Sequence, residues 1–179
     1  YLDWPFLDQR HRDLSAALED WCAAHLPVDH HDVDAACRGL VAALGAGGWL
    51  RHSGTGEGER LDVRTLCLIR ETLARHDALA DFAFAMQGLG MGAVSLFGSA
   101  AQRRWLERTR SGTAISAFAL TEPGSGSDVA ATATTAVRVP GGWRLDGEKT
   151  WISNGGIADI YVIFARTGEA PGAKGLSAF

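Results

Sequence analysis

Apolar side chains recur every three or four residues over the first part of the chain, from Pro5 to Arg110. This spacing places them on one face of an α-helix, so the pattern predicts a series of amphipathic helices. The second and third stripes fall within residues 33–44 and 66–73, and the first consists of Leu7, Leu14, Leu18, Trp21 and His25.

Residues 78–98 are almost entirely apolar and about as long as one helix, which predicts a buried central helix. Its glycines at positions 88, 90 and 92 cost stability in a helix. They are explained either by close packing of another element or by a ligand that approaches the helix. Ser99 and Gln102 then form a capping-box pattern, which predicts a last helix ending at Arg110.

From residue 113 onward the apolar positions change from helical spacing to alternating or continuous runs, which are typical of strands. The pair Asp146-Gly147 separates two such runs and predicts a hairpin, and 140–142 predict another turn. The strand-like runs are residues 114–121, 131–139, 143–146, 148–153, 160–166 and 175–179.

These patterns predict an α+β protein with two domains. We expect an all-helical domain over residues 1–112 and an antiparallel β domain over residues 113–179. The last run ends at Phe179 and would leave an unpaired apolar edge, and the chain does not begin with Met. We therefore expect a fragment with an incomplete β domain.

Composition narrows the class of protein. A net charge of −4 argues against a nucleic-acid binder, which needs a basic face. No apolar run approaches the roughly 20 residues of a membrane span, and no signal peptide is visible, so we expect a cytoplasmic protein without a membrane span. Its three cysteines are far apart and predict reduced, mostly buried thiols. The histidines and aspartates of residues 25–32 predict a solvated turn rather than a metal site.

Two stretches carry candidate chemistry. In "FALTEPGSGSD" (118–128) a strand stops at a turn of glycines and small hydroxyl residues, where bare backbone N–H groups and hydroxyls could meet an anion or a carbonyl. An ordinary hairpin turn explains the same residues. In "KTWISNGG" (149–156) a Trp face and a hydroxyl would suit a flat heterocycle, although a core Trp is the simpler alternative.

The chain has a helical half followed by these two stretches in this order, and this arrangement resembles the acyl-CoA dehydrogenase family of flavoenzymes. The resemblance covers essentially the whole chain and is strongest in the two motifs. It implies a helical N-terminal domain, a middle β-barrel domain and a C-terminal helical bundle, of which this chain supplies the first and most of the second.

The resemblance also implies site residues. In the first motif, Thr121 would hydrogen-bond the ring system of FAD, and Ser127 would contact both FAD and the pantetheine arm of acyl-CoA. In the second motif, Trp151 would lie against the flavin and Ser153 would offer its hydroxyl to it. The acyl pocket would lie at the central helix. The cofactor-binding residues implied are Phe118, Leu120, Thr121, Gly126, Ser127, Trp151, Ile152 and Ser153, and the substrate-binding residues are Met86, Gln87, Leu89 and again Ser127.

Dehydrogenation of an acyl thioester needs a carboxylate base for the Cα proton and a flavin that takes the Cβ hydride. The resemblance places that base beyond residue 179 and gives Glu122 a structural role, so we expect no catalytic base and no metal ligand in this chain. It implies FAD as cofactor, a thioester on CoA or on a carrier protein, an electron-transfer flavoprotein or similar acceptor, and a homo-oligomer. A flavin oxidase or monooxygenase, and a non-catalytic flavin-holding half paired with another chain, remain alternatives.

Overall fold

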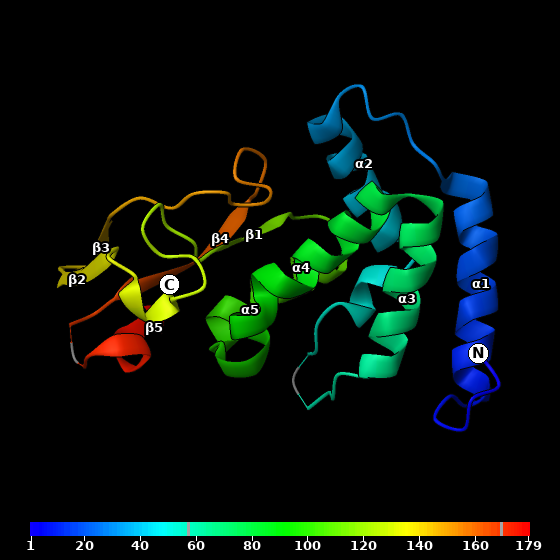
Figure 1. The fold of residues 1–179 in the computed structure, drawn as a ribbon, viewed down its shortest axis with the longest axis horizontal. Coiled ribbons are helices and arrows are strands. Elements are labelled where there is room, and N and C mark those ends of the chain that lie inside the picture. The colour runs from blue at the N-terminus through cyan, green and yellow to red at the C-terminus, as the bar shows by residue number, and fades with distance from the viewer. Residues whose placement is uncertain (57, 169) are drawn as a thin grey trace.

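A computed structural model describes residues 1–56, 58–168 and 170–179. The helices lie at one end of the molecule and the strands at the other, with α4 and α5 between them (Figure 1). The helices are α1 (Gln9–His25), α2 (Val33–Ala46), α3 (Val63–His76), α4 (Ala78–Phe97) and α5 (Ala100–Arg110), with short 3-10 turns η1 (Trp49–His52), η2 (Val129–Ala131) and η3 (Gly172–Gly175). The strands are β1 (Ser116–Ala119), β2 (Thr135–Val139), β3 (Gly142–Asp146), β4 (Ile160–Arg166) and β5 (Leu176–Ala178).

Side-chain caps begin several helices. The carboxylates of Asp32, Asp62 and Asp77 accept hydrogen bonds from backbone N–H groups of the first turns of α2, α3 and α4. Helix α5 begins with the expected capping box, in which the Ser99 N–H donates to Gln102 Oε1 at 2.8 Å. The helix starts are therefore encoded locally.

The apolar helix α4 is the centre of the molecule and contacts α2, α3, α5 and β1. Two of its glycines allow this close packing. A Cβ at Gly88 would lie 2.3 Å from the Ser53 carbonyl oxygen, and one at Gly90 would lie 2.3 Å from Ser116 Oγ. Close packing thus explains both glycines.

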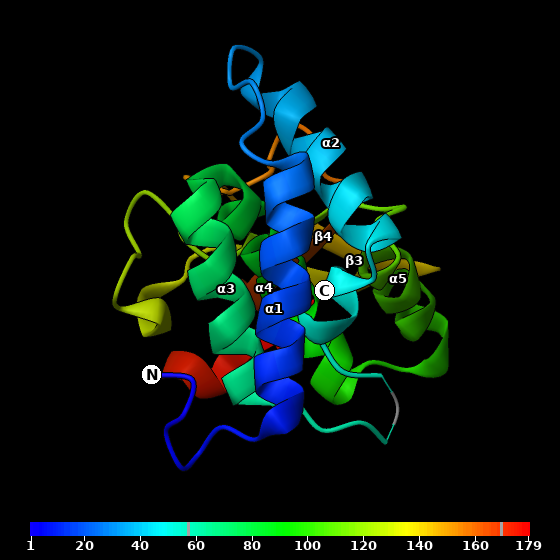
Figure 2. The ribbon, with the colours of Figure 1, turned by 90° about the vertical axis from the view of Figure 1, so that its right-hand side faces the viewer.

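By length and composition, α4 could also cross a membrane, with a mean hydropathy of 1.3 over its most apolar window. The expectation that no apolar run approaches that length is therefore wrong. Core helices of globular proteins pass the same test, and α4 packs against α2, α3, α5 and β1. In the view of Figure 2 it lies behind α1.

The buried face of α1 differs from the expected stripe. Leu18 is buried as expected, but Trp21 is only half-buried and His25 is exposed. The other buried positions are His11 and Cys22, together with Ser15. His11 is accommodated because its Nε2 lies 3.1 Å from an Asp62 carboxylate oxygen, so a polar side chain occupies a core position that hydrophobicity alone does not reveal.

The sheet is mixed and open, with the order β1-β4-β2-β3 and β5 beside β4. β4 runs parallel to β1 and β2, whereas β2–β3 and β4–β5 are antiparallel. The expected antiparallel barrel is therefore not found in the described residues. Alternation of apolar positions indicates strands, but it carries no information on their direction.

The expected hairpin at Asp146-Gly147 is also wrong. The hairpin joins β2 and β3 through Pro140 and Gly141, and Gly141 has a φ of +84°, which favours glycine. Residues 148–153 are not a strand but an irregular segment that bonds to the first motif. The cysteines are free as expected, with Cys22 and Cys37 buried and Cys67 exposed.

Candidate functional site

The two motifs lie side by side, joined by direct hydrogen bonds. The Thr150 N–H donates to the Thr121 carbonyl at 3.0 Å. Lys149 Nζ donates to the Leu120 carbonyl at 2.9 Å and to Glu122 Oε1 at 2.8 Å. Residues almost thirty positions apart in the sequence are thereby brought together at the end of β1.

Glu122 is the centre of this junction. Its carboxylate is 6% exposed and accepts hydrogen bonds from the Ala133 N–H at 2.6 Å, the Thr134 N–H at 2.9 Å and Lys149. Burial alone would raise the pKa of Glu122, but the bonds from Lys149, Thr134 and Ala133 outweigh it and lower the pKa to about 2. A carboxylate held in this way stays ionised at neutral pH and takes up no proton, so its role here is structural.

The turn after Glu122 is closed by its own backbone. Glu122 and Ser125 exchange N–H···O bonds of 2.9 and 3.1 Å, and the buried Ser125 hydroxyl donates to the Asp128 carbonyl at 2.8 Å. Gly126 and Ser127 are exposed. Within the described part of the chain, a Cβ added at Gly124 or Gly126 would have no heavy atom within 4 Å. One side of the turn is therefore bare.

The second motif continues from this junction as a loop over residues 151–157. Trp151 is 90% exposed and has a φ of +57°, in the left-handed region that a bulky residue rarely occupies. Ile152 and Ser153 are half-buried, and Asn154 also has a positive φ, of +62°. An exposed indole and a partly exposed hydroxyl thus stand next to the bare turn, whereas the simpler expectation was a Trp packed in the core.

The residues expected on β1 lie at the same place. Phe118 is half-buried and packs on Phe164 of β4, with ring centroids 5.1 Å apart. Leu120 and Thr121 follow it at the strand end and are also half-buried. The residues expected at the cofactor therefore lie along the end of β1, the turn and the adjoining loop.

Gln87 has a different environment from the one expected of a substrate contact. It is 1% exposed, and its amide donates to the Ala114 carbonyl at 2.7 Å and accepts from the Ser116 N–H at 2.9 Å. These bonds tie α4 to β1. The half-buried Met86 is held by its backbone, whose carbonyl accepts from Ser116 Oγ at 3.2 Å.

Leu89 is exposed and lines a pocket of about 240 Å³ between α3, α4, Ser53 and Leu61. The other lining residues are Leu66, Arg70, Phe84, Ala85 and Gly88. Three positions of α4 were expected at the acyl pocket, and Leu89 is the one of them that is exposed and lines a pocket.

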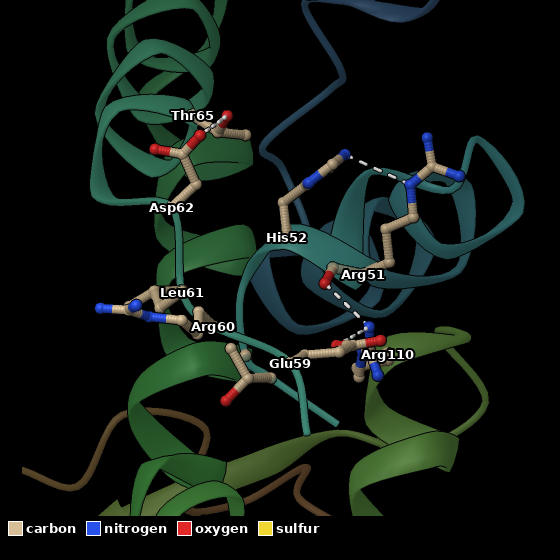
Figure 3. A pocket seen from close by; sticks show the side chains of 10 residues that line it. Arg51, His52, Glu59, Arg60, Leu61, Asp62, Thr65 and Arg110 are labelled. Atoms are coloured by element: carbon tan, nitrogen blue, oxygen red, sulfur yellow. Dashed lines mark hydrogen bonds and ion pairs between the residues drawn. The ribbon is translucent and has the colours of Figure 1, made fainter. Parts of the chain in front are cut away.

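A second pocket, of about 360 Å³, lies between η1, the start of α3 and the end of α5 (Figure 3). Arg110 crosses it and donates to the Arg51 carbonyl at 3.2 Å and to Glu59 at 2.9 Å. The side chains of Arg51 and Arg60 point to opposite sides of the pocket rather than into it. The lining residues of this pocket lie outside both motifs, and its Arg110 and Glu59 are paired with each other.

Sequence reasoning missed two residues of the site, Lys149 and Asn154. Lys149 has an exposed fraction of 10%, and only its place at the start of the second motif marked it. Asn154 Nδ2 donates to the Ser116 carbonyl at 3.1 Å and so connects the loop to β1. Among the described residues no group of three or more potential metal ligands occurs.

Comparison with known proteins agrees with this arrangement. Family models described as the acyl-CoA dehydrogenase N-terminal and middle domains match residues 8–113 and 117–179. The chain is 50% identical over 86 residues to mouse very long-chain specific acyl-CoA dehydrogenase, covering 46% of the chain and 13% of that protein. It is 35% identical to cyclohex-1-ene-1-carbonyl-CoA dehydrogenase of Syntrophus aciditrophicus, covering 84% of the chain and 37% of that enzyme.

Among solved structures, the chain resembles an acyl-CoA dehydrogenase of Bacillus anthracis complexed with FAD. The TM-score is 0.81 at 29% identity, covering 97% of this chain and 31% of that one. The chain thus spans well under half the length of these relatives. Two family models in the expected order cover nearly all of it, and the protein belongs to the acyl-CoA dehydrogenase family.

Proposed function

We propose that this chain forms the N-terminal and middle part of an FAD-dependent enzyme that oxidises an acyl thioester to its α,β-unsaturated form. The observation that carries the proposal is the junction of the two motifs. The bonds of Lys149 and Thr150 to residues 120–122 place a bare turn, two hydroxyls and an exposed indole next to each other.

These residues fit a flat, hydrogen-bonding cofactor. The turn at Gly124 and Gly126 is open where a side chain would otherwise stand, so a ligand can approach its backbone. Thr121 and Ser153 offer hydroxyls that donate or accept, and Trp151 offers an aromatic face. In this proposal the rest of the surface that contacts the cofactor consists of Phe118, Leu120, Gly126, Ser127 and Ile152. FAD, when bound, would accept the hydride from Cβ.

The role of this chain is to hold and orient rather than to abstract the Cα proton. Glu122 is the carboxylate nearest the motifs' junction, and its pKa of about 2 makes it too weak a base. In this proposal the base comes from residues outside this chain, as the family resemblance implies. The thioester would approach across the bare side of the turn at Ser127, with Leu89 and Met86 nearer its acyl end.

The carrier of the thioester, CoA or a carrier protein, is left open in this proposal, as is the length of the acyl chain. An electron-transfer flavoprotein or similar protein is the proposed acceptor, and a homo-oligomer in the cytoplasm is the proposed state. The acceptor and the homo-oligomer rest on the family resemblance, and the cytoplasmic location rests on the widely spaced cysteines, which are typical of a reducing compartment.

An anaerobic absorption titration of the purified protein with a panel of acyl-CoA thioesters tests the reaction. Bleaching of the flavin band by one thioester is the expected result. A flavin band that no CoA thioester and no carrier-bound thioester bleaches would contradict the dehydrogenase activity.

The variant Gly126→Val tests the site. We expect flavin affinity to fall at least about tenfold, because the side chain fills the space left for the ligand. The folding stability should stay within about 0.5 kcal/mol, since the added atoms meet no described neighbour. Gly142→Val, at an equally open position on β3, is the matched control and should retain flavin. Wild-type affinity in Gly126→Val would contradict the assignment.

A further inference from the structure

The loop over residues 151–157 is held by the helical part of the protein as well as by the sheet. Asn154 lies at its centre, with its Nδ2 donating to the Ser116 carbonyl of β1 at 3.1 Å. On the other side its Oδ1 accepts from the Cys37 thiol of α2 at 3.6 Å. The neighbouring Arg38 of α2 donates to the Ile157 carbonyl at 3.3 Å. Consecutive residues of one helix thus reach two points of the loop.

The end of this loop is part of the helical core. Ile157 is 7% exposed and belongs to the same buried cluster as Cys37, Leu40 and Val41 of α2. The backbone between Asn154 and Ile157 is a closed turn, in which the Ile157 N–H donates to the Asn154 carbonyl at 3.0 Å. The loop is therefore anchored in the helical core at this end.

The other end of the loop is also fixed, by the bond between Thr150 and Thr121. Trp151 lies between the two anchors and has a φ of +57° while 90% of it is exposed. A bulky residue does not adopt this conformation by local preference, so the surrounding anchors must impose it. Asn154, the only asparagine of the chain, tolerates its own φ of +62° much better than most residues do.

We infer that Asn154 is a positioning residue: held by Ser116, Cys37 and, through Ile157, by Arg38, it sets the conformation in which Trp151 and Ser153 are presented beside the turn of the first motif. The helical part thereby sets the geometry of a site built mainly from the β part. That this geometry serves a flavin rests on the proposed function. The positioning itself is a property of the ligand-free protein.

Hydrogen exchange and NMR of the flavin-free protein test the positioning. The indole N–H resonance of Trp151 is assigned with Trp151→Phe. In Asn154→Ala we expect amide exchange over residues 151–157 to rise about tenfold and the Trp151 indole resonance to shift, because both the amide bonds and the tolerance of positive φ are lost. Asn154→Gly keeps the conformational tolerance and should restore part of the protection. Such a partial rescue separates positioning from a loss of fold.

If Asn154→Ala does not fold, a variant with a smaller expected effect still tests the positioning. Arg38 is exposed, so Arg38→Met removes only its bond to the Ile157 carbonyl and should raise exchange over residues 151–157 about two- to threefold. Arg144→Met, at an exposed arginine of β3, is the matched control and should leave that exchange unchanged. Unchanged exchange and an unchanged Trp151 resonance in folded Asn154 and Arg38 variants would overturn the inference.

A flavin titration of the same variants separates the two proposals. We expect the dissociation constant for FAD to rise about tenfold in Asn154→Ala and less in Asn154→Gly. If the loop loosens in the variants but the wild-type protein binds no flavin, the positioning stands and the proposed function fails. If the wild-type protein binds flavin and the loosened variants bind it equally well, the functional part of the inference fails.

Discussion

The turn of the first motif and the loop of the second motif are neighbours, yet they are stabilised differently. The turn at residues 121–128 is held by a buried carboxylate, by Lys149 and by its own backbone bonds. The loop at residues 151–157 is held by Asn154 and by Ile157 in the helical core, with an exposed Trp151 between its anchors. An ion pair thus supports the turn, whereas packing and hydrogen bonds without a paired carboxylate support the loop. Variants should affect the two segments separately.

Removing the cation from the turn should have the largest effect. In Lys149→Met the Glu122 carboxylate stays buried without its counter-ion, so we expect a loss of about 3 kcal/mol in the free energy of unfolding. Urea denaturation measures this loss. The double variant with Glu122→Gln should recover part of it, because no uncompensated charge remains. A loss below about 1 kcal/mol in Lys149→Met would show that the ion pair does not support the turn.

Filling the space beside Thr134 should have the next largest effect. A Cβ at Gly147 would lie 2.4 Å from Thr134 Oγ1 and 2.7 Å from its Cα, so Gly147→Val must displace Thr134, whose N–H donates to Glu122. We expect a loss of about 2 kcal/mol by denaturation. Gly126→Val, in the open part of the turn at residues 121–128, is the comparison and should change stability little. Equal losses in both variants would contradict the described packing.

The turn should also respond to pH, whereas the loop should not. The pKa of Glu122 is lowered from 4.5 to about 2, so its stabilising contribution is complete above pH 4.5 and is lost as the pH falls from 4.5 toward 2. The unfolding free energy of wild-type protein should therefore fall more steeply in this range than that of Glu122→Gln. Asp62, whose pKa is also about 2, titrates in both proteins and cancels in the difference. Identical slopes would show that Glu122 is not the titrating group.

Relieving the backbone of Trp151 should have the smallest effect on stability and the opposite sign. Trp151→Gly removes an exposed side chain from a left-handed conformation, so we expect a gain of about 0.5–1 kcal/mol together with weaker flavin binding. Thermal unfolding and a flavin titration measure the two changes. Trp4→Gly, at an exposed position with an ordinary φ, should give no gain. A loss of stability in Trp151→Gly would mean that the indole packs on the protein.

Elements with a strong local signal were predicted well. The capping box placed the start of α5, and the continuous apolar run at 160–166 is strand β4 itself. The two motifs were recognised from their residue types and order. Predictions that depended on pairing were less successful, because the Asp146-Gly147 hairpin and the antiparallel barrel both required knowledge of which strands become neighbours.

The sequence alone determined the helical first half, most strands of the second half, and the family to which the two motifs point, since helix spacing, caps and short motifs are local properties of the chain. Tertiary structure decided which residues support those motifs. Only the fold brings Lys149 to Glu122 and Asn154 between Cys37 and Ser116, across 27 to 117 positions of sequence. Tertiary structure also decided that the side chain of Gln87 hydrogen-bonds to Ser116 of β1. Long-range contacts of this kind leave no periodic or local pattern in the chain, because they depend on how separate elements pack together.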